Sequence, residues 1–532
     1  MSIVIPKKFL TKHIFKLILA IFCIEILSLI SFKSAILSSM FLILISIIVL
    51  LFTLYKLEYG LYIALIELII GSYGYLFYLQ LPGFKAPIRL AIFLIVFFVW
   101  VIKFKFIPHF SGQEKSLLKQ GINYFKKNRL VQNLILFLIF IAIGVINGLA
   151  RGNGLQNVFF DFNGYLYFGL FFVFLEVFKN EQQIINFLKI LIASLTYVSL
   201  KVFITLYFFS HGFLNTSDLL YHWIRDTRVG EITYAGANFF RIFFQSQIWS
   251  LIGIFIILGL IIAKLLKQKK LLCHPEPVEG SVITQSPRSL TLFGMTKGLF
   301  LLLIITQTSI LISFSRSFWL GAIIGFLALF AYLIFKERLK LKKLAQIFLI
   351  ILSSGIISIL LLVSIANFPI PKPTSELALS LLKTRFTAFF GEAGVSSRWN
   401  QLPVLTDQIK KTPLLGTGFG TSLTYKSNDP RIKNESNPEG WYTTYTFEWG
   451  YLDTITEMGI IGLIIYLGLI AQIFYVGIKS LVIQESKWLN LGLLIGIIVL
   501  ITVNMFSPYL NHPLGIGYLM LCTAIFNIKK DG

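Results

Sequence analysis

The stretch Leu344–Ala366, LAQIFLIILSSGIISILLLVSIA, decides the class of fold. It is an apolar run without a charged residue, and it ends where the longest polar interval of the chain, Asn367–Gly462, begins. A helix of about 20 apolar residues spans the hydrocarbon core of a bilayer. Similar runs recur along the chain, and they are continuous rather than alternating. We therefore expect an all-α integral membrane protein, a polytopic helical bundle, and not a transmembrane barrel.

The composition agrees with this class. Hydrophobic residues make up 56% of the chain and charged residues 13%, whereas soluble domains carry about 25% charged residues. A net charge of +23 would suggest nucleic acid binding in a soluble protein. Here we attribute the charge to basic residues in short loops, which orient the helices. We expect contact with membrane lipid and no nucleic acid partner. Three cysteines indicate neither a disulfide framework nor a metal cluster.

A criterion of about 20 residues per span predicts about 14 transmembrane helices. The expected spans are 14–31, 36–55, 59–79, 88–106, 131–149, 158–178, 184–209, 240–263, 298–314, 317–336, 344–366, 456–478, 488–505 and 508–526.

Basic residues predict the sidedness of these spans. Lys and Arg are concentrated in the loops 103–129, 264–297 and 336–343, which this count puts on the same side as both termini. Because positive loops stay inside, we expect both termini in the cytoplasm and a multi-pass protein of the cytoplasmic membrane. The partly helical loop 367–450 then lies outside the cell. The loop 210–239 and the tight hairpin at Ser315-Arg316-Ser317 lie there as well.

We divide the chain into four parts. Residues 1–263 hold the N-terminal spans, 298–480 a core with the long outer loop 367–450, and 481–532 the C-terminal spans. The loop 264–297 between the first two contains a foreign segment from Cys273 to about Thr296. This segment resembles the translated form of mobile palindromic repeats of bacterial genomes, and we expect it to be a disordered insertion.

Arginines outside the predicted spans are candidates for binding an anion. Arg316 lies between two apolar runs with almost no room for a loop, so it either anchors the hairpin by snorkelling or binds phosphate. Arg398 is expected near the start of an amphipathic helix capped by Ser396 or Ser397, with Pro403 in its first turn and Thr412-Pro413 at its end. A guanidinium beside free N–H groups favours an anion; the alternative is a surface or salt-bridging arginine.

Other polar features support or accompany these arginines. The loop 210–239 supplies His222, Arg225 and Arg228, either as cations for a polyanionic ligand or as solvated surface. Gly416–Gly420, GTGFG, lacks the lysine and spacing of a nucleotide loop, and we expect a tight turn whose backbone passes close to another segment.

Three carboxylates, Glu448, Asp453 and Glu457, are expected at the outer membrane face. Asp453 and Glu457 are four residues apart and share a helix face. Each carboxylate is either a general base near a boundary of low dielectric constant or an acid that suits the N-terminal dipole of the helix beginning here.

The order of these motifs resembles the O-antigen ligase/O-antigen polymerase superfamily of bacterial membrane glycosyltransferases. The resemblance is greatest over residues 225–470, and especially at 313–321, 397–420 and 448–467. It implies a metal-independent, inverting transfer that needs no cofactor. A glycan on a polyprenyl diphosphate carrier is the donor, and the acceptor is a hydroxyl of a lipid-linked, core-lipid or other glycan. By the same resemblance Arg228, Arg316 and Arg398 hold the diphosphate. Independently of the resemblance, Asp453, Glu457, His222 and Arg225 are candidate supporting residues of the site.

One position departs from the ligases, which carry a histidine as general base eleven residues before the Gly-x-x-Gly motif. In this chain Glu448 occupies that place. Either Glu448 is the base, or the chain belongs to a polymerase-like branch with another base, or activity is lost. Ligase and polymerase thus stay open, as do two other classes: a transporter of lipid-linked sugars and a noncatalytic protein of envelope assembly. A transporter would carry functional charges near the bilayer midplane and paired halves.

Overall fold

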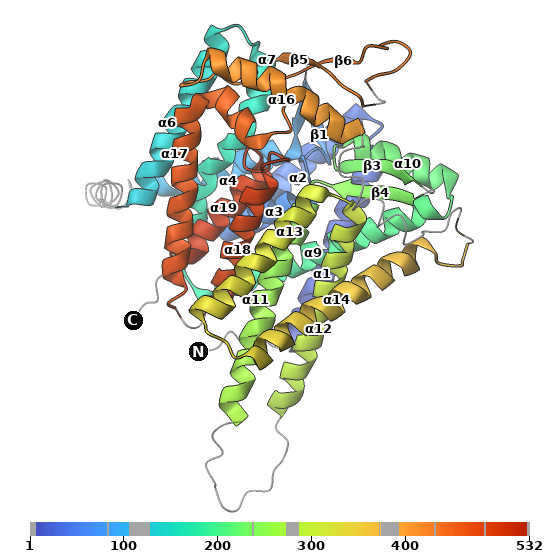
Figure 1. The fold of residues 1–532 in the computed structure, drawn as a ribbon, viewed down its shortest axis with the longest axis vertical. Helices are drawn as coiled ribbons and strands as arrows, with labels where there is room; N and C mark the ends of the chain where they lie inside the picture. Colours follow the sequence, from blue (N-terminus) through green and yellow to red (C-terminus); the bar gives the residue numbers. More distant parts are fainter. Residues whose placement is uncertain are drawn as a thin grey trace, which may run out of the picture.

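The computed structural model is a helical bundle (Figure 1). It describes residues 7–81, 84–105, 128–236, 239–272, 287–371, 373, 393–429, 432–483 and 486–528. Within these ranges 9 helices are long and apolar enough to cross a membrane, and three shorter apolar helices cover Lys297–Ser313, Lys487–Val503 and Pro513–Phe526. The integral membrane class is therefore confirmed. The predicted number of about 14 spans is not.

The helices are α1 Lys7–Ser31, α2 Ala35–Tyr55, α3 Leu57–Ile70, α4 Ile88–Lys105, α6 Arg129–Ala150, α7 Leu155–Phe162, α8 Phe171–Val177, α9 Glu181–Ser210, α10 Leu214–Asp226, α11 Gln247–Leu272, α12 Pro287–Ser313, α13 Arg316–Ala331, α14 Leu341–Ala366, α16 Ala393–Lys411, α17 Gly450–Ser480, α18 Lys487–Val503 and α19 Pro513–Phe526. A 3-10 helix, Asn163–Leu170, joins α7 to α8, and a π-helical turn, Tyr332–Lys336, follows α13. The antiparallel strand pairs are β1 Tyr78–Leu81 with β2 Phe84–Pro87, β3 Gly230–Gly236 with β4 Phe239–Phe244, and β5 Leu423–Lys426 with β6 Trp441–Thr444.

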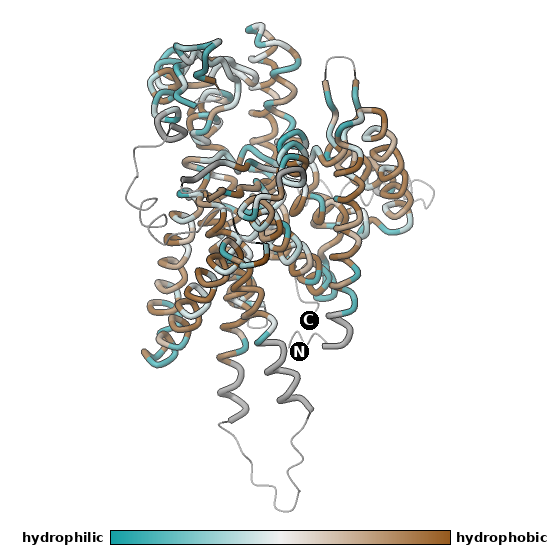
Figure 2. The backbone as a smooth tube through the Cα atoms, turned by 90° about the vertical axis from the view of Figure 1, so that its right-hand side faces the viewer, coloured by the Kyte–Doolittle hydropathy of each residue, from teal (hydrophilic) through white to brown (hydrophobic). Residues whose placement is uncertain are grey.

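The centre of the bundle is α18, which is buried along most of its length. It packs against α11 and α13, and more weakly against α17 and α19. The end of α11 and the start of α12 lie at the lower end in Figure 1, and α16 with β5 and β6 lies at the opposite end. Hydrophobic residues dominate the helices, and hydrophilic ones are more frequent towards the two ends (Figure 2). The sidedness of the basic loops and of the long polar loop stays a prediction.

Several predicted boundaries are wrong. Residues 240–244 form β4 and not the start of a span, and α3 ends at Ile70 and does not continue to residue 79. The expected span 158–178 is interrupted by the 3-10 segment. The loop expected at 264–297 is helical as far as Leu272 and again from Pro287. The first part of the expected insertion, 273–286, and most of the loop 103–129 lie outside the described residues, as does 374–392 of the outer loop.

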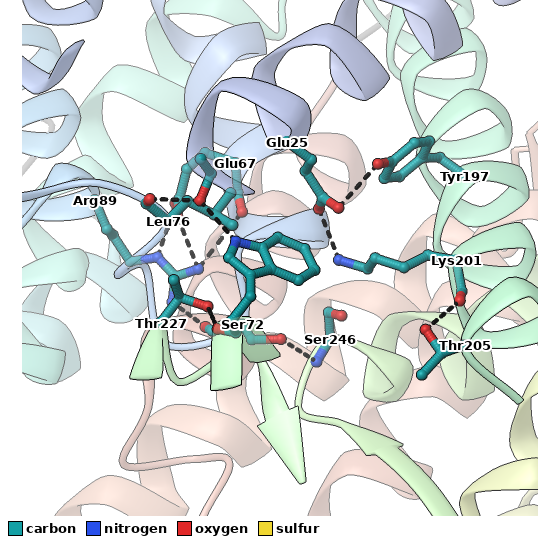
Figure 3. A network of polar contacts seen from close by, with 12 residues as sticks. Glu25, Glu67, Ser72, Leu76, Arg89, Tyr197, Lys201, Thr205, Thr227 and Ser246 are labelled. Atoms are coloured by element: carbon teal, nitrogen blue, oxygen red, sulfur yellow. Dashed lines mark hydrogen bonds and ion pairs between the residues drawn. The ribbon is translucent and has the colours of Figure 1, made fainter. Parts of the chain in front are cut away.

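Buried ion pairs connect some of the helices (Figure 3). These pairs were not predicted from the sequence. Lys201 of α9 donates to Glu25 of α1 at 2.7 Å, and Arg89 of α4 pairs with Glu67 of α3 at 2.8 Å. Tyr197 also donates to Glu25 at 2.9 Å. Because charges within a membrane need partners, these pairs fix the helices against one another.

Candidate active site

A cavity of about 410 Å³ lies between the β3–β4 ribbon, the start of α17 and the connection between α18 and α19. Much of its lining is non-helical backbone, including the 3-10 segment within the expected span 158–178. Irregular backbone at membrane depth is tolerated where it lines a cavity. The polar lining residues are Tyr73, Tyr75, Arg89, Asp161, Asn163, Tyr167, Arg228, Glu231, Arg241, Gln245, Ser315, Arg398, Tyr445, Thr446, Glu448, Asp453, Glu457, Ser507, Tyr509, Asn511 and His512.

Guanidinium groups from distant parts of the chain meet at this cavity. Arg228 and Arg398 line it, and Arg316 follows the lining residue Ser315. Burial lowers the pKa of Arg398 to about 10; Arg241 and Arg316 lower it as well, and Glu231 opposes them. The guanidinium is still charged at neutral pH, and an anion beside it would relieve the repulsion from its neighbours.

Arg228 has a conformation that is unusual for its residue type. It follows α10, and its φ is 53°, in the left-handed region that favours glycine. The amide of Arg228 donates to Arg225, and that of Val229 donates to Ile224, which are the two hydrogen bonds of a Schellman motif. The Arg228 guanidinium lies 4.8 Å from the centre of the Tyr75 ring. An arginine where the backbone favours glycine suggests that its side chain is needed at the cavity.

The hairpin at Ser315-Arg316-Ser317 is tied to the cavity by neighbouring segments. Arg241 of β4 donates through Nε to the carbonyl of Ser313 at 2.7 Å. The hydroxyls of Ser315 and Ser317 are 3.1 Å apart, and Ser317 lies 3.3 Å from Ser507. The turn between α12 and α13 is therefore held beside both β4 and the connection from α18 to α19.

The helix carrying Arg398 differs from the prediction. It begins at Ala393, so Arg398 is not at its N-terminus and Pro403 lies inside the helix and not in its first turn. The end at Lys411, before Thr412-Pro413, agrees with the prediction. The argument from free N–H groups at a helix start therefore does not apply to Arg398.

Arg398 instead forms an ion pair with Glu448 through its Nε. The side chains of Arg398 and Glu448 are 36% and 46% exposed, so the pair stays accessible from the cavity. The indole of Trp449 donates to the carbonyl of Arg398 at 2.9 Å, and the amide of Glu448 donates to Gln401 at 3.2 Å. These contacts hold the start of α17 against α16.

The predicted pair Asp453 and Glu457 lies on one face of α17, and both side chains are buried while lining the cavity. Asp161 of α7 joins them there. Asp161 accepts from the amide of Gly420 at 2.7 Å, so the glycine-rich turn reaches the cavity wall.

The turn at 416–420 passes close to two helices, as the sequence predicts. A Cβ at Gly418, whose φ is +86°, would lie 2.1 Å from the amide nitrogen of Gly148 in α6. On the other side the turn meets a kink in α17 at Gly459, where the amide of Ile460 donates to Pro413 at 2.9 Å. The segment that leads into the turn therefore replaces a hydrogen bond that the kink removes from the helix.

Two predicted supporting residues lie elsewhere. His222 is 3.5 Å from Asp218, and Arg225 donates to Tyr221 at 2.7 Å; neither residue lines the cavity. The sequence did not point to Arg89, Asp161 or Arg241 as site residues, although all three line the cavity.

His512 also lines the cavity and was not predicted. Burial, with a smaller contribution from Arg89, holds its pKa well below the usual value, so the ring is neutral. Its Nδ1 accepts from the amide of Leu514 at 3.2 Å, which places the ring proton on Nε2. This histidine caps α19 and presents a donor, so it does not replace the histidine that the ligases use as base.

Comparison with known proteins finds a family match that covers part of the cavity lining. Residues 299–467 match the family described as O-Antigen ligase. The match includes the hairpin at Arg316, the helix of Arg398 and the start of α17, whereas Arg228 and Asp161 lie outside it. No curated protein matches the chain. The family match confirms the resemblance to the O-antigen ligase/O-antigen polymerase superfamily.

Proposed function

We propose that this integral membrane protein, whose residues 299–467 match the O-Antigen ligase family, transfers a glycan from a polyprenyl diphosphate carrier to an acceptor hydroxyl. The reaction takes place at the outer face of the cytoplasmic membrane, with both termini of the chain inside. Arg228, Arg316 and Arg398 hold the diphosphate. Glu448 accepts the proton of the attacking hydroxyl.

One observation carries this proposal: Arg228, Arg398 and Glu448 line a single cavity although they come from three separate segments. Arg316 is close enough to influence the pKa of Arg398. A cavity with several guanidinium groups and a carboxylate fits a reaction in which a diphosphate leaves and a hydroxyl attacks.

The chemistry balances without a cofactor. The acceptor oxygen forms a bond to the anomeric carbon while the bond from that carbon to the diphosphate oxygen breaks. The electron pair of the broken bond stays on the diphosphate, where guanidinium groups stabilise the negative charge. The acceptor proton passes to the Glu448 carboxylate. Attack opposite to the leaving group inverts the configuration at the anomeric carbon.

The ion pair between Arg398 and Glu448 fits this division of labour. Arginine has five N–H donors, and the contact with Glu448 uses Nε. The terminal nitrogens of Arg398 make no hydrogen bond within the described part of the chain, so they can bind phosphate while Nε orients the base. The base and the phosphate-binding group are then adjacent, as a displacement at one carbon requires.

The test is a transfer reaction with purified protein in liposomes that contain polyprenyl-diphosphate-linked oligosaccharide. A ladder of longer glycans identifies a polymerase, and a single shifted acceptor identifies a ligase. Because Glu448 stands where the ligases carry a histidine, we expect the ladder that identifies a polymerase. Unchanged glycans with correctly inserted protein would contradict the proposal. Arg398→Ala should abolish the product, and Arg225→Ala, which removes an exposed arginine outside the cavity lining, should not.

A further inference from the structure

The cavity has a second polar side, formed by the carboxylates of Asp161, Asp453 and Glu457. On the arginine side, Glu448 pairs with Arg398. On the second side the carboxylates interact electrostatically with one another. Buried carboxyl oxygens on this side require hydrogen-bond donors.

Each of these carboxyl groups accepts a hydrogen bond from another part of the protein. Asp161 accepts from the amide of Gly420 at 2.7 Å, and Glu457 accepts from the hydroxyl of Tyr165 at 2.9 Å. Asp453 accepts through Oδ2 from the amide group of Asn511 at 3.0 Å. The donors come from different segments, and each contact fixes the orientation of a carboxylate in the cavity wall.

The other carboxyl oxygen of Asp453, Oδ1, lacks such a donor within the part of the chain that the structure describes. Asp453 is 5% exposed, and its buried Oδ1 has no hydrogen-bond partner among the described residues. A buried polar atom without a hydrogen-bond partner destabilises the folded protein, because the atom has lost its contacts with water. Because Asp453 lines the cavity, a ligand in the cavity can supply the donor.

The residues around these carboxylates limit the chemical class of ligand that fits the cavity. Tyrosine rings line the cavity together with the carboxylates, including Tyr73, Tyr445 and Tyr509. Tyr445 interacts electrostatically with both Asp161 and Arg228, so it lies where the two polar sides meet. A sugar ring offers hydroxyl donors to carboxylates and C–H faces to aromatic rings. No group of three or more His, Cys, Asp or Glu side chains in the described ranges has the arrangement of a metal site.

We infer that Asp161, Asp453 and Glu457 form a subsite for one sugar ring, which donates a hydroxyl hydrogen bond to Oδ1 of Asp453. This inference rests on the proposed function, since it concerns the sugar that reacts next to the diphosphate. The sugar belongs either to the donor glycan, as the ring attached to the diphosphate, or to the acceptor, as the ring that attacks. Both present the same hydroxyl chemistry.

The experiment compares wild-type protein with Asp453→Asn in liposomes, using purified polyprenyl-diphosphate-linked oligosaccharide as donor and a separate lipid-linked acceptor. KM is measured for each substrate, and the inhibition constant is measured for polyprenyl diphosphate without sugar. Asp407→Asn serves as a control because Asp407 is an exposed carboxylate paired with Lys410 on α16. Asn511→Ala is a second test variant, since it releases the anchored oxygen of Asp453 and leaves the carboxylate in place.

The expected result is a rise of about tenfold or more in one KM for Asp453→Asn, the size of one lost hydrogen bond to a charged group. The inhibition constant of sugar-free polyprenyl diphosphate should stay within twofold of wild type. A change in the donor KM assigns the subsite to the donor sugar, and a change in the acceptor KM assigns it to the acceptor. Asn511→Ala should raise the same KM by a smaller factor.

Two outcomes would overturn the inference. One is an unchanged KM for both substrates, and the other is an equal loss of affinity for sugar-free polyprenyl diphosphate, which would place Asp453 in diphosphate binding or in folding. Failure of the wild-type protein to transfer any glycan would instead contradict the proposed function. The two failures are therefore distinguishable.

Discussion

At the residue scale, the site depends on charged side chains, and one of them requires an unfavourable backbone conformation. Arg228 occupies the position after α10 where glycine is the usual residue, with φ at 53°. Glu448 is not an isolated base, because it pairs with Arg398. Both features follow if these side chains are retained for binding and chemistry and not for stability.

Replacing Arg228 by glycine distinguishes a role in ligand binding from a role in stability. We expect Arg228→Gly to leave the melting temperature in detergent unchanged or higher, because glycine relieves left-handed strain of about 1 kcal/mol. Affinity for polyprenyl diphosphate should fall by about tenfold or more, the size of one charge-assisted hydrogen bond. Thermal unfolding and a binding titration on the same preparation check both parts. A stable variant with wild-type affinity would remove Arg228 from the diphosphate site.

Glu448→Gln tests the base. The amide keeps the shape of the side chain but cannot accept the acceptor proton, so transfer should slow by about 10²–10⁴-fold. The donor KM should change far less, because the terminal nitrogens of Arg398 still face the cavity. Glu439→Gln is the matched control, since Glu439 is 65% exposed and pairs with Lys426. Wild-type turnover in Glu448→Gln would assign the base to another carboxylate of the cavity.

At the element scale, the outer loop is built into the membrane helices. The turn at 416–420 lies between α6 and the kink of α17. At the kink, Gly459 has φ +70°, and the amides of Ile460 and Ile461 donate to the carbonyls of Pro413 and Leu414, just before the turn. The position of the outer helix α16 is therefore coupled to the start of α17, where Glu448 and Asp453 lie.

Alanine at Gly459 should break this coupling. The added Cβ would lie 2.0 Å from the carbonyl oxygen of Leu414, and left-handed strain adds about 1–3 kcal/mol. We expect a lower melting temperature for Gly459→Ala and loss of transfer. Gly468→Ala is a control in the same helix, because nothing lies within 4 Å of its Cβ position. Equal stability of the two variants would show that the kink is not needed.

The elements also show which predictions the sequence permits. Long apolar runs identify α14 and α17 because a membrane span has a simple length and hydropathy. The ribbon β3–β4 was missed because Phe239–Phe244 is as apolar as the helix after it, so the two read as one span. The i, i+4 spacing of Asp453 and Glu457 predicted their common face. Asp161 could not be found in this way, since tertiary packing alone brings it to α17.

At the scale of the whole molecule, buried ion pairs hold the scaffold behind the cavity (Figure 3). Lys201 pairs with Glu25 and also lies 5.1 Å from the centre of the Phe244 ring in β4. Arg89 pairs with Glu67 and lines the cavity. A transporter would use charges within the membrane to bind its cargo. Here these charges are neutralised by each other, which favours a structural role beneath the ribbon.

Removing one partner of such a pair should be costly. Lys201→Met leaves Glu25 buried without its cation, and we expect the free energy of unfolding to fall by about 3–5 kcal/mol. The double variant Lys201→Met with Glu25→Gln should recover part of this stability, because no uncompensated charge remains. Melting temperatures of the single and double variants in detergent measure the difference. A single variant as stable as wild type would show that the pair does not hold α1 to α9.

The most direct measurement of the central claim is a structure of the protein with polyprenyl diphosphate bound in a lipid nanodisc. The account predicts both phosphate groups in the cavity, within hydrogen-bond distance of Arg228 and Arg398 and beside Arg316, with Glu448 facing the oxygen that bears the glycan. Phosphate density outside this cavity, or on the opposite side of the membrane from Glu448, would contradict it.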